Sequence, residues 1–157
     1  MADVYAAATR SKVMAAVRAK NTAPEIAVRR ALHEHGYRFR LHRRDLPGSP
    51  DILLPRHHMA VFVHGCFWHG HGCKRAKRPA SNTDYWDAKR ARNMRRDAAA
   101  QAALRDAGWR VAVIWTCRQQ ADTEELLSRL ASPEDERSEV VPRQPLDDGQ
   151  RDGITET

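Results

Sequence analysis

The sequence predicts a single α/β domain in which a central mixed β-sheet is flanked by helices. The chain has 157 residues, a length that favours one domain with a hydrophobic core of its own. Some segments have apolar residues at helical spacing, and others have short apolar runs or strict alternation. Their order is helix, three strands, helix, strand, helix, which is typical of an α/β sandwich.

The first predicted helix begins at a capping box. Thr22-Ala-Pro-Glu25 has the required residue types, and Pro24 suits the first turn. Gly36 is expected to end this helix. The stripe that would face the core consists of Val28, Ala31, Leu32 and His35.

Three strands are predicted after this helix. Residues 37–41 alternate apolar and basic side chains, as a half-buried strand does. A turn cluster at 46–50 follows, and the apolar runs 51–54 and 59–63 predict the second and third strands.

Residues 64–83 have no periodicity and are interpreted as a long functional loop. A long helix should begin at Thr83 or Asp84 and end at Gly108. Residues 109–115 are apolar on both faces, as in a central strand. The last helix is expected to begin at Thr123, with Leu126, Leu127 and Leu130 facing inward.

Charge divides the chain into a basic part and an acidic part. Residues 1–132 contain 24 Lys and Arg against 12 Asp and Glu, which leaves +12. Residues 133–157 contain three Arg against eight acidic residues, which leaves −5. We therefore predict a basic N-terminal DNA-binding arm at 1–20, a folded domain at 21–132 and a disordered acidic tail at 133–157. So basic a body favours a polyanionic partner, either nucleic acid or an anionic membrane surface.

Several classes of protein are excluded by composition. No apolar run approaches the roughly 20 residues that a membrane span needs, and the first residues lack a signal-peptide core. Three cysteines are too few for a disulfide scaffold, so we expect a reducing compartment, the cytoplasm.

The segment HGCFWHGHGC at 64–73 predicts a zinc site. Zinc prefers a tetrahedron of thiolate and imidazole ligands. The predicted set, which uses every cysteine of the chain, is Cys66, His71, Cys73 and Cys117, with His69 as an alternative fourth ligand. Small buried cysteines can also be core filler, but a Gly- and His-rich loop offers little core to fill.

A carboxylate and an imidazole are expected at one edge of the sheet. Asp51 begins one predicted strand and His64 follows the next. A carboxylate there suits Mg²⁺, and a nearby histidine can activate water or stabilise a phosphate. Glu25 would lie on the preceding helix. Asp51 could instead close a turn, and Glu25 could serve the capping box alone.

Aromatic and cationic side chains surround this region. Phe67 and Trp68 are adjacent in a glycine-flanked loop, and Trp86 begins the long helix. Such residues can be wedges that unstack DNA, or they can pack on the sheet. Lys89 and Asn93 lie four residues apart on one helix face. The cations of 74–96 that favour phosphate contact are Lys74, Arg75, Lys77, Arg78, Lys89, Arg90, Arg92, Arg95 and Arg96.

Several of these motifs together resemble the very-short-patch-repair (Vsr) DNA mismatch endonucleases of bacteria. The resemblance extends from the N-terminus to about Ala131, and the HGCFWH run is highly specific. The motifs that carry it are Pro50-Asp51, Phe62-Val-His64, HGCFWH at 64–69, Cys73, Tyr85-Trp86, Gly108-Trp-Arg-Val111 and the openings Met-Ala-Asp-Val and Ala8-Thr-Arg-Ser-Lys12.

The resemblance implies the restriction-endonuclease-like fold and an activity. Members of that family nick the strand that carries the T of a T·G mismatch, 5′ of that T, after 5-methylcytosine has deaminated. The implied partner is double-stranded DNA with this mismatch, with a MutL-type mismatch-repair protein as a candidate second partner. We expect a monomer in the bacterial cytoplasm, associated with the nucleoid and not with a membrane.

The resemblance also implies roles for individual residues. Asp51 would bind Mg²⁺ with the backbone carbonyl of Val63, and His69 would activate water. His64 would stabilise a phosphate or leaving group, and Glu25 would assist through metal-bound water. The structural zinc ligands would be Cys66, His71, Cys73 and Cys117, and the DNA-binding residues Phe67, Trp68, Trp86, Lys89 and Asn93, to which we add Arg10, Lys12 and Met14 of the arm.

Three departures and two alternatives accompany this interpretation. Gly70 and Gly72 stand where members of that family can carry further histidines. Position 63 is Val where Thr is expected, and no Glu-x-Lys follows Asp51, so histidine must supply what lysine supplies in other nucleases of the fold. One alternative is a sequence-specific, restriction-type nuclease that cuts perfect duplex. The other is a zinc-stabilised DNA-binding module without catalysis, for which Asp51 would be dispensable.

Overall fold

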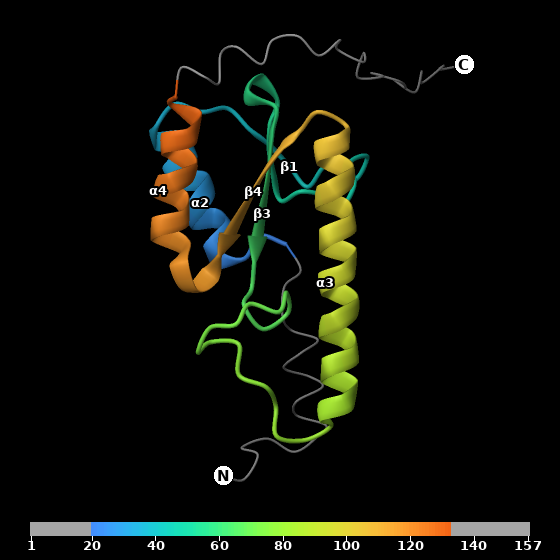
Figure 1. The fold of residues 1–157 in the computed structure, drawn as a ribbon. Coiled ribbons are helices and arrows are strands. Elements are labelled where there is room, and N and C mark those ends of the chain that lie inside the picture. The colour runs from blue at the N-terminus through green and yellow to red at the C-terminus, as the bar shows by residue number, and fades with distance from the viewer. Residues whose placement is uncertain (1–19, 133–157) are drawn as a thin grey trace, which may run out of the picture.

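A four-stranded mixed sheet forms the centre of the protein (Figure 1). The computed structural model describes residues 20–132. The predicted arm and tail, with Arg10, Lys12 and Met14, lie outside this range. The strands, in spatial order, are β1 (Arg40–Leu41), β2 (Ile52–Leu54), β3 (Met59–His64) and β4 (Arg110–Trp115). The first three are antiparallel neighbours, and β4 runs parallel to β3. The predicted mixed α/β sheet is therefore confirmed.

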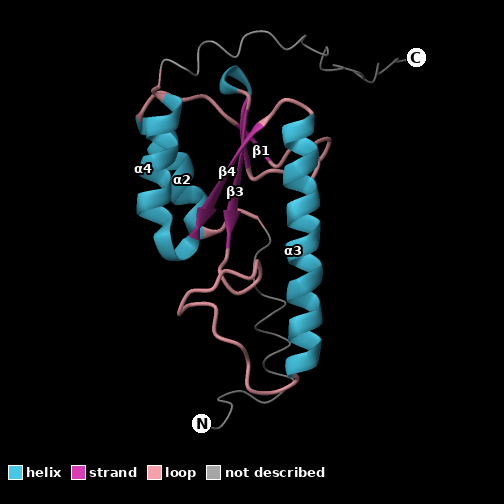
Figure 2. Cartoon of the chain, in the orientation of Figure 1, coloured by secondary structure: helices cyan, strands magenta, loops and turns pink. Residues whose placement is uncertain are grey.

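Helices cover both faces of the sheet. The helices are α2 (Ala23–Glu34), α3 (Thr83–Asp106) and α4 (Gln119–Leu130), and two 3₁₀ turns lie at Pro55–His57 and Thr116–Arg118. Helices α2 and α4 lie together on one side of the sheet and α3 on the other (Figure 2). Within residues 20–132, no helix has the length and apolar character needed to cross a membrane.

The strand alternation divides the core into two layers. Ile52 and Leu54 of β2 face α2 and α4, whereas Leu53 between them faces α3. The first layer is completed mainly by Val28, Leu32, Met59, Val61, Ile114, Leu126 and Leu130, and the second by Ala60, Phe62 and Leu104. Because successive strand residues point to opposite faces, a strand with helices on both sides is apolar on both faces, as β2 and residues 59–63 of β3 are.

Helix α2 begins at the predicted capping box and ends beside the predicted stop, Gly36, whose φ is +81°. The Thr22 hydroxyl accepts a hydrogen bond from the Glu25 amide, as in a capping box. The helix stops at Glu34, and His35 is the exposed C-cap residue with its ring against the Ala31 carbonyl. The prediction that His35 faces the core was wrong, because the helical stripe does not continue past the helix end.

The first strand is shorter than predicted. Only Arg40 and Leu41 pair with β2, and both are exposed. The Tyr37 amide bonds the Leu32 carbonyl and so belongs to the end of α2. Tyr37 and Phe39 still pack against the core, which explains the apolar alternation.

The C-terminal elements also differ from the prediction. Strand β4 is the edge strand of the described sheet and not a central one. Helix α4 begins at Gln119, four residues before Thr123. The Thr123 hydroxyl bonds the Gln119 carbonyl inside the helix, and the Asp122 carboxylate accepts from the Trp115 amide. Asp122 is therefore the acidic residue of the first turn of α4, and its hydrogen bond connects the helix to the end of β4.

Gly48 brings the turn before β2 against α3. Its φ is +73°, and a Cβ at this position would lie 2.6 Å from the Cβ of Ala100. A larger residue would therefore push the chain that leads to Asp51 away from α3.

Candidate functional site

The predicted carboxylate and imidazole lie at the same end of the sheet. Strands β2 and β3 are antiparallel, so the residue that precedes β2 lies beside the end of β3. The Val63 amide donates a 2.8 Å hydrogen bond to Asp51 Oδ2, and His64 is the next residue. Loop 65–82 leaves β3 at this end, toward which the β3 arrow points in Figure 1.

Asp51 is a partly buried carboxyl with an altered pKa. Burial, opposed by the Val63 amide, raises its pKa to about 6. The Glu25 carboxylate raises the pKa further, and the Arg29 guanidinium lowers it. Ligand atoms of Asp51, Glu25 and His42 lie within 4.8 Å of one another, so these residues could hold a metal ion.

Glu25 is buried, and protein donors occupy both of its carboxylate oxygens. Oε1 accepts from the Thr22 hydroxyl at 3.0 Å. Oε2 accepts from the Asn21 amide at 3.0 Å and from Arg29 Nη2 at 3.1 Å. The same Arg29 nitrogen lies 3.1 Å from Nε2 of His42.

Sequence reasoning missed Arg29 and His42. Arg29 follows Glu25 by four residues on a helix, a spacing that favours an ion pair and could have identified it. His42 lies in a run of cations without a distinguishing pattern. It reaches the site because its amide bonds the Asp51 carbonyl beside the β1–β2 pair.

Two histidines and an aspartate form a second cluster. The rings of His64 and His69 stack with their centroids 3.8 Å apart. Nδ1 of His69 lies 2.5 Å from Oδ2 of Asp97 on α3. Burial, together with the neighbouring His69, lowers the pKa of His64 to about 4, although Asp97 opposes this change. His64 is therefore neutral at pH 7. Asp97 was also missed, since nothing in the α3 sequence distinguishes it.

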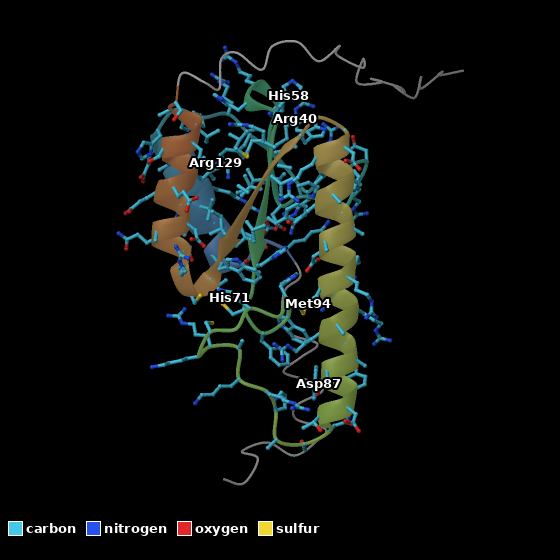
Figure 3. All side chains as sticks on the ribbon, viewed as in Figure 1. Arg40, His58, His71, Asp87, Met94 and Arg129 are labelled. Atoms are coloured by element: carbon cyan, nitrogen blue, oxygen red, sulfur yellow. The ribbon has the colours of Figure 1, made fainter. Side chains whose placement is uncertain are left out.

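The structure brings the predicted zinc ligands together. Ligand atoms of Cys66, His71, Cys73 and Cys117 lie within 4.8 Å of one another, and Figure 3 shows His71 beside sulfur atoms at the foot of the sheet. His69, the alternative ligand, belongs to the cluster with His64 and Asp97 instead. Three thiols and an imidazole are the donor set that zinc prefers.

Two thiols of this cluster have pKa values that are shifted in opposite directions. Burial opposes ionisation of Cys66, but hydrogen bonds from Thr116, His71 and Cys117 outweigh it and lower the Cys66 pKa to about 6. Burial and the neighbouring Cys66 and Cys73 raise the pKa of Cys117 to about 11. Thiolate is the form that binds metal, so one ligand of the set ionises easily.

The aromatic residues gather between the loop and α3. The rings of Phe67, Trp68 and Trp86 have centroids between 5.0 and 5.9 Å apart. Trp86 is buried, with 8% of its surface exposed, whereas Phe67 and Trp68 are partly exposed. In this structure the loop pair is therefore the accessible part of the predicted wedge, and Trp86 supports it from behind.

Lys89 and Asn93 both contact this aromatic cluster. Lys89 Nζ lies 5.1 Å from the ring centroid of Trp68 and 5.6 Å from that of Trp86. Asn93 Nδ2 donates to the Trp68 carbonyl at 3.1 Å. In the same loop and helix, the side chains of Lys74, Arg75, Lys77, Arg78, Arg92, Arg95 and Arg96 are exposed.

Comparison with known proteins identifies relatives over most of the chain. A family model described as DNA mismatch endonuclease Vsr matches residues 2–75. The type II nicking enzyme V.XorIIP of Xanthomonas oryzae is 55% identical over 74% of this chain and 86% of its own length. V.NmeAIP of Neisseria meningitidis is 39% identical over 83% and 94%. The DNA mismatch endonuclease Vsr of Escherichia coli is 40% identical over 83% and 86%.

Proposed function

The chain belongs to the Vsr family and is a DNA endonuclease, and from this premise we propose that it nicks duplex DNA at T·G mismatches. The nick would fall 5′ of the mismatched T and begin very short patch repair. The family name and the mismatch activity named for the E. coli relative support this specificity. The mixed sheet supports the restriction-endonuclease-like fold.

The proposal depends on the side chains that the structure brings together at one end of the sheet. One end of the sheet holds a carboxylate at the start of β2, a histidine pair and an aromatic loop beside a cationic helix. The carboxylate and histidines are suited to phosphodiester hydrolysis, and the aromatic and cationic side chains are suited to DNA.

Mg²⁺ fits the donors around Asp51. A partly buried carboxyl with a raised pKa is costly to ionise without a cation beside it. Asp51 and the Val63 carbonyl would hold the ion, which would stabilise negative charge on the scissile phosphate. The oxygens of Glu25 already accept bonds from the protein, which supports an indirect role for Glu25.

His69 is suited to act as the base. Its Nδ1 faces the Asp97 carboxylate, so in the neutral ring this nitrogen carries the proton and Nε2 has a free lone pair. Nε2 can then accept a proton from an attacking water, and Asp97 stabilises the resulting cation. Neutral His64 can donate one N–H to a phosphate oxygen or the leaving oxygen.

The zinc ion would have a structural role. Cys66, His71 and Cys73 lie in the loop, and Cys117 lies in the turn after β4. A zinc ion held by all four would fix the loop to the sheet next to the histidine pair.

A MutL-type partner and a monomeric state stay predictions of the resemblance.

A nicking assay tests the proposed function. One labelled duplex should be compared in three forms, with T·G, T·A or C·G at the same position, with and without Mg²⁺. We expect Mg²⁺-dependent cleavage of the T strand of the T·G duplex alone. Equal cleavage of the paired duplexes would indicate a restriction-type nuclease. Tight binding without cleavage in wild type and Asp51→Asn alike would indicate a binding module.

A further inference from the structure

Side chains of α3 hold four consecutive residues of the loop. Phe67 and Trp68 are bound through their carbonyls, His69 through its ring, and Gly70 through close packing. The α3 residues that make these contacts are Arg90, Asn93, Asp97 and Met94. One helix thus sets the position of the accessible wedge pair and of the histidine that follows it.

Arg90 makes two contacts with Phe67. Its Nε donates a 3.1 Å hydrogen bond to the Phe67 carbonyl. Its guanidinium carbon lies 5.6 Å from the centroid of the Phe67 ring, within the range of a cation–π contact. Arg90 therefore fixes both the backbone and the ring of this residue.

The next contacts continue along the helix. Asn93 binds the Trp68 carbonyl at 3.1 Å, and Asp97 pairs with His69 at 2.5 Å. Met94 points toward the loop (Figure 3), and a Cβ at Gly70 would lie 2.2 Å from its sulfur. Residues 67–70 of the loop therefore lie directly against α3.

We propose that Arg90 is a positioning residue that holds the Phe67–Trp68 pair in the conformation that enters DNA at the mismatch. The inference rests on the proposed function and names a specificity residue for it. A wedge that is held before binding loses less conformational freedom when it inserts between bases. Since His69 follows Trp68 directly, the same contact fixes the position of the Phe67–Trp68 pair relative to His69, the proposed general base.

The competing role for Arg90 is contact with a DNA phosphate. A phosphate contact depends on the guanidinium charge, whereas the anchor depends on an N–H at the position of Nε. Glutamine places its amide nitrogen the same number of bonds from the backbone as Nε of arginine and carries no charge. Arg90→Gln therefore keeps the hydrogen bond to the Phe67 carbonyl and loses the cation–π contact, whereas Arg90→Met, of similar length, removes both.

The first measurement uses the zinc-loaded protein without DNA. Amide hydrogen exchange should be about tenfold faster at residues 67–70 in Arg90→Met than in wild type, because the loss of one hydrogen bond from a charged donor is of this size. Arg90→Gln should lie close to wild type. Equal exchange in Arg90→Met and wild type would overturn the anchor. Thermal melting checks that both variants are folded.

The second measurement is kcat/KM on T·G and T·A duplexes. Relative to wild type, the kcat/KM of Arg90→Met should fall about tenfold on T·G and little on T·A. Arg90→Gln should keep most of the wild-type kcat/KM on T·G. Arg92→Met removes the same charge from an exposed position of α3 and should lower kcat/KM equally on both duplexes. A loss in Arg90→Gln as large as in Arg90→Met, equal on both duplexes and reduced by salt, would make Arg90 a phosphate contact and overturn the proposal.

The two measurements separate this inference from the proposed function. If wild type does not prefer T·G, the proposed specificity is wrong, and the exchange data still decide whether Arg90 anchors the loop. If wild type prefers T·G and Arg90→Met keeps the full preference, the positioning role is wrong and the proposed function stands.

Discussion

The imidazole rings of His64 and His69 lie parallel, with their centroids 3.8 Å apart and their planes 3° apart. Two protonated rings at this distance would repel each other strongly. Burial, together with the neighbouring His69, keeps the pKa of His64 low, at about 4, although Asp97 opposes this change. Asp97 bonds the His69 ring directly, so its carboxylate orients that ring and can stabilise positive charge on it.

This arrangement predicts the effects of two substitutions on nicking. His69→Ala should bind T·G duplex and lose about 10²–10⁴ in the single-turnover rate, the usual contribution of a general base. Asp97→Asn should lose less, about tenfold to a hundredfold, since the imidazole remains but its orientation is no longer fixed. Binding and single-turnover nicking on one substrate provide the comparison.

Metal content is the control for these two variants. Neither His69 nor Asp97 belongs to the cysteine cluster, so both variants should keep zinc. If His69→Ala loses zinc together with activity, the residue is a zinc ligand and its assignment as the base is wrong.

Without Mg²⁺, Asp51→Asn should raise the free energy of unfolding of the protein at neutral pH. The pKa of Asp51 is raised from 3.8 to about 6, so the folded protein binds this proton more tightly than the unfolded chain. Ionised Asp51 therefore costs stability above about pH 6, and the cost vanishes as the pH falls toward 4. The variant should gain about 1–3 kcal/mol at pH 7 and little at pH 4. Urea denaturation at both pH values, with zinc bound and no Mg²⁺ added, measures the difference.

The same substitution should abolish most nicking while DNA binding is kept or improved, because a negative charge near the phosphate is lost. In wild type the rate should fall at acidic pH, because protons compete with Mg²⁺ for the Asp51 carboxylate, whose pKa without metal is raised to about 6. Nicking by Asp51→Asn within about tenfold of wild type would limit the contribution of the carboxylate to about 1.4 kcal/mol and place the metal elsewhere.

Cys117→Ser should lose zinc and cooperative folding together. The predicted ligands come from the loop and from the turn after β4, and in such sites the metal affinity, of order 10 kcal/mol, is largely folding free energy. Elemental analysis and thermal melting measure the two losses. A variant that purifies with one zinc and melts like wild type would contradict the site.

Trp68→Ala should weaken binding to T·G duplex more than to T·A duplex, by about tenfold. Trp68 is partly exposed, and unstacking costs least where pairing is already poor. Trp86→Ala is the informative comparison, because Trp86 is buried and its removal should also lower the melting temperature. Equal losses on both duplexes would make Trp68 a packing residue.

A chain that ends at Ser132 should fold and nick normally. The residues removed have three Arg and eight acidic side chains and few apolar ones. Loss of about five negative charges should strengthen DNA binding about twofold to fivefold at low salt, with the difference vanishing at high salt. A large fall in the melting temperature would show that the tail belongs to the domain.

Local signals predicted most of the fold. The capping box at Thr22, the glycines after α2 and α3, and the apolar runs of β2 and β3 fix their elements through nearby residues. The errors lie where a distant contact decides. Asp122 ties α4 to the end of β4, and the place of β4 at the edge of the described sheet depends on the whole strand order.

The site divides in the same way between sequence and structure. By itself the sequence determined the chemical groups: three cysteines and an imidazole for a metal, a carboxylate before one strand and histidines after the next. Only the tertiary structure decided the partners. Asp97 and His42 reach the site from segments without a distinguishing pattern, and the cationic run that contains Arg90 does not indicate its contact with the Phe67 carbonyl. The physical reason is that residue type is local, whereas contact depends on pairing and packing between distant segments. Asp97 lies 28 residues from His69 along the chain, and the packing of the loop against α3 brings them together.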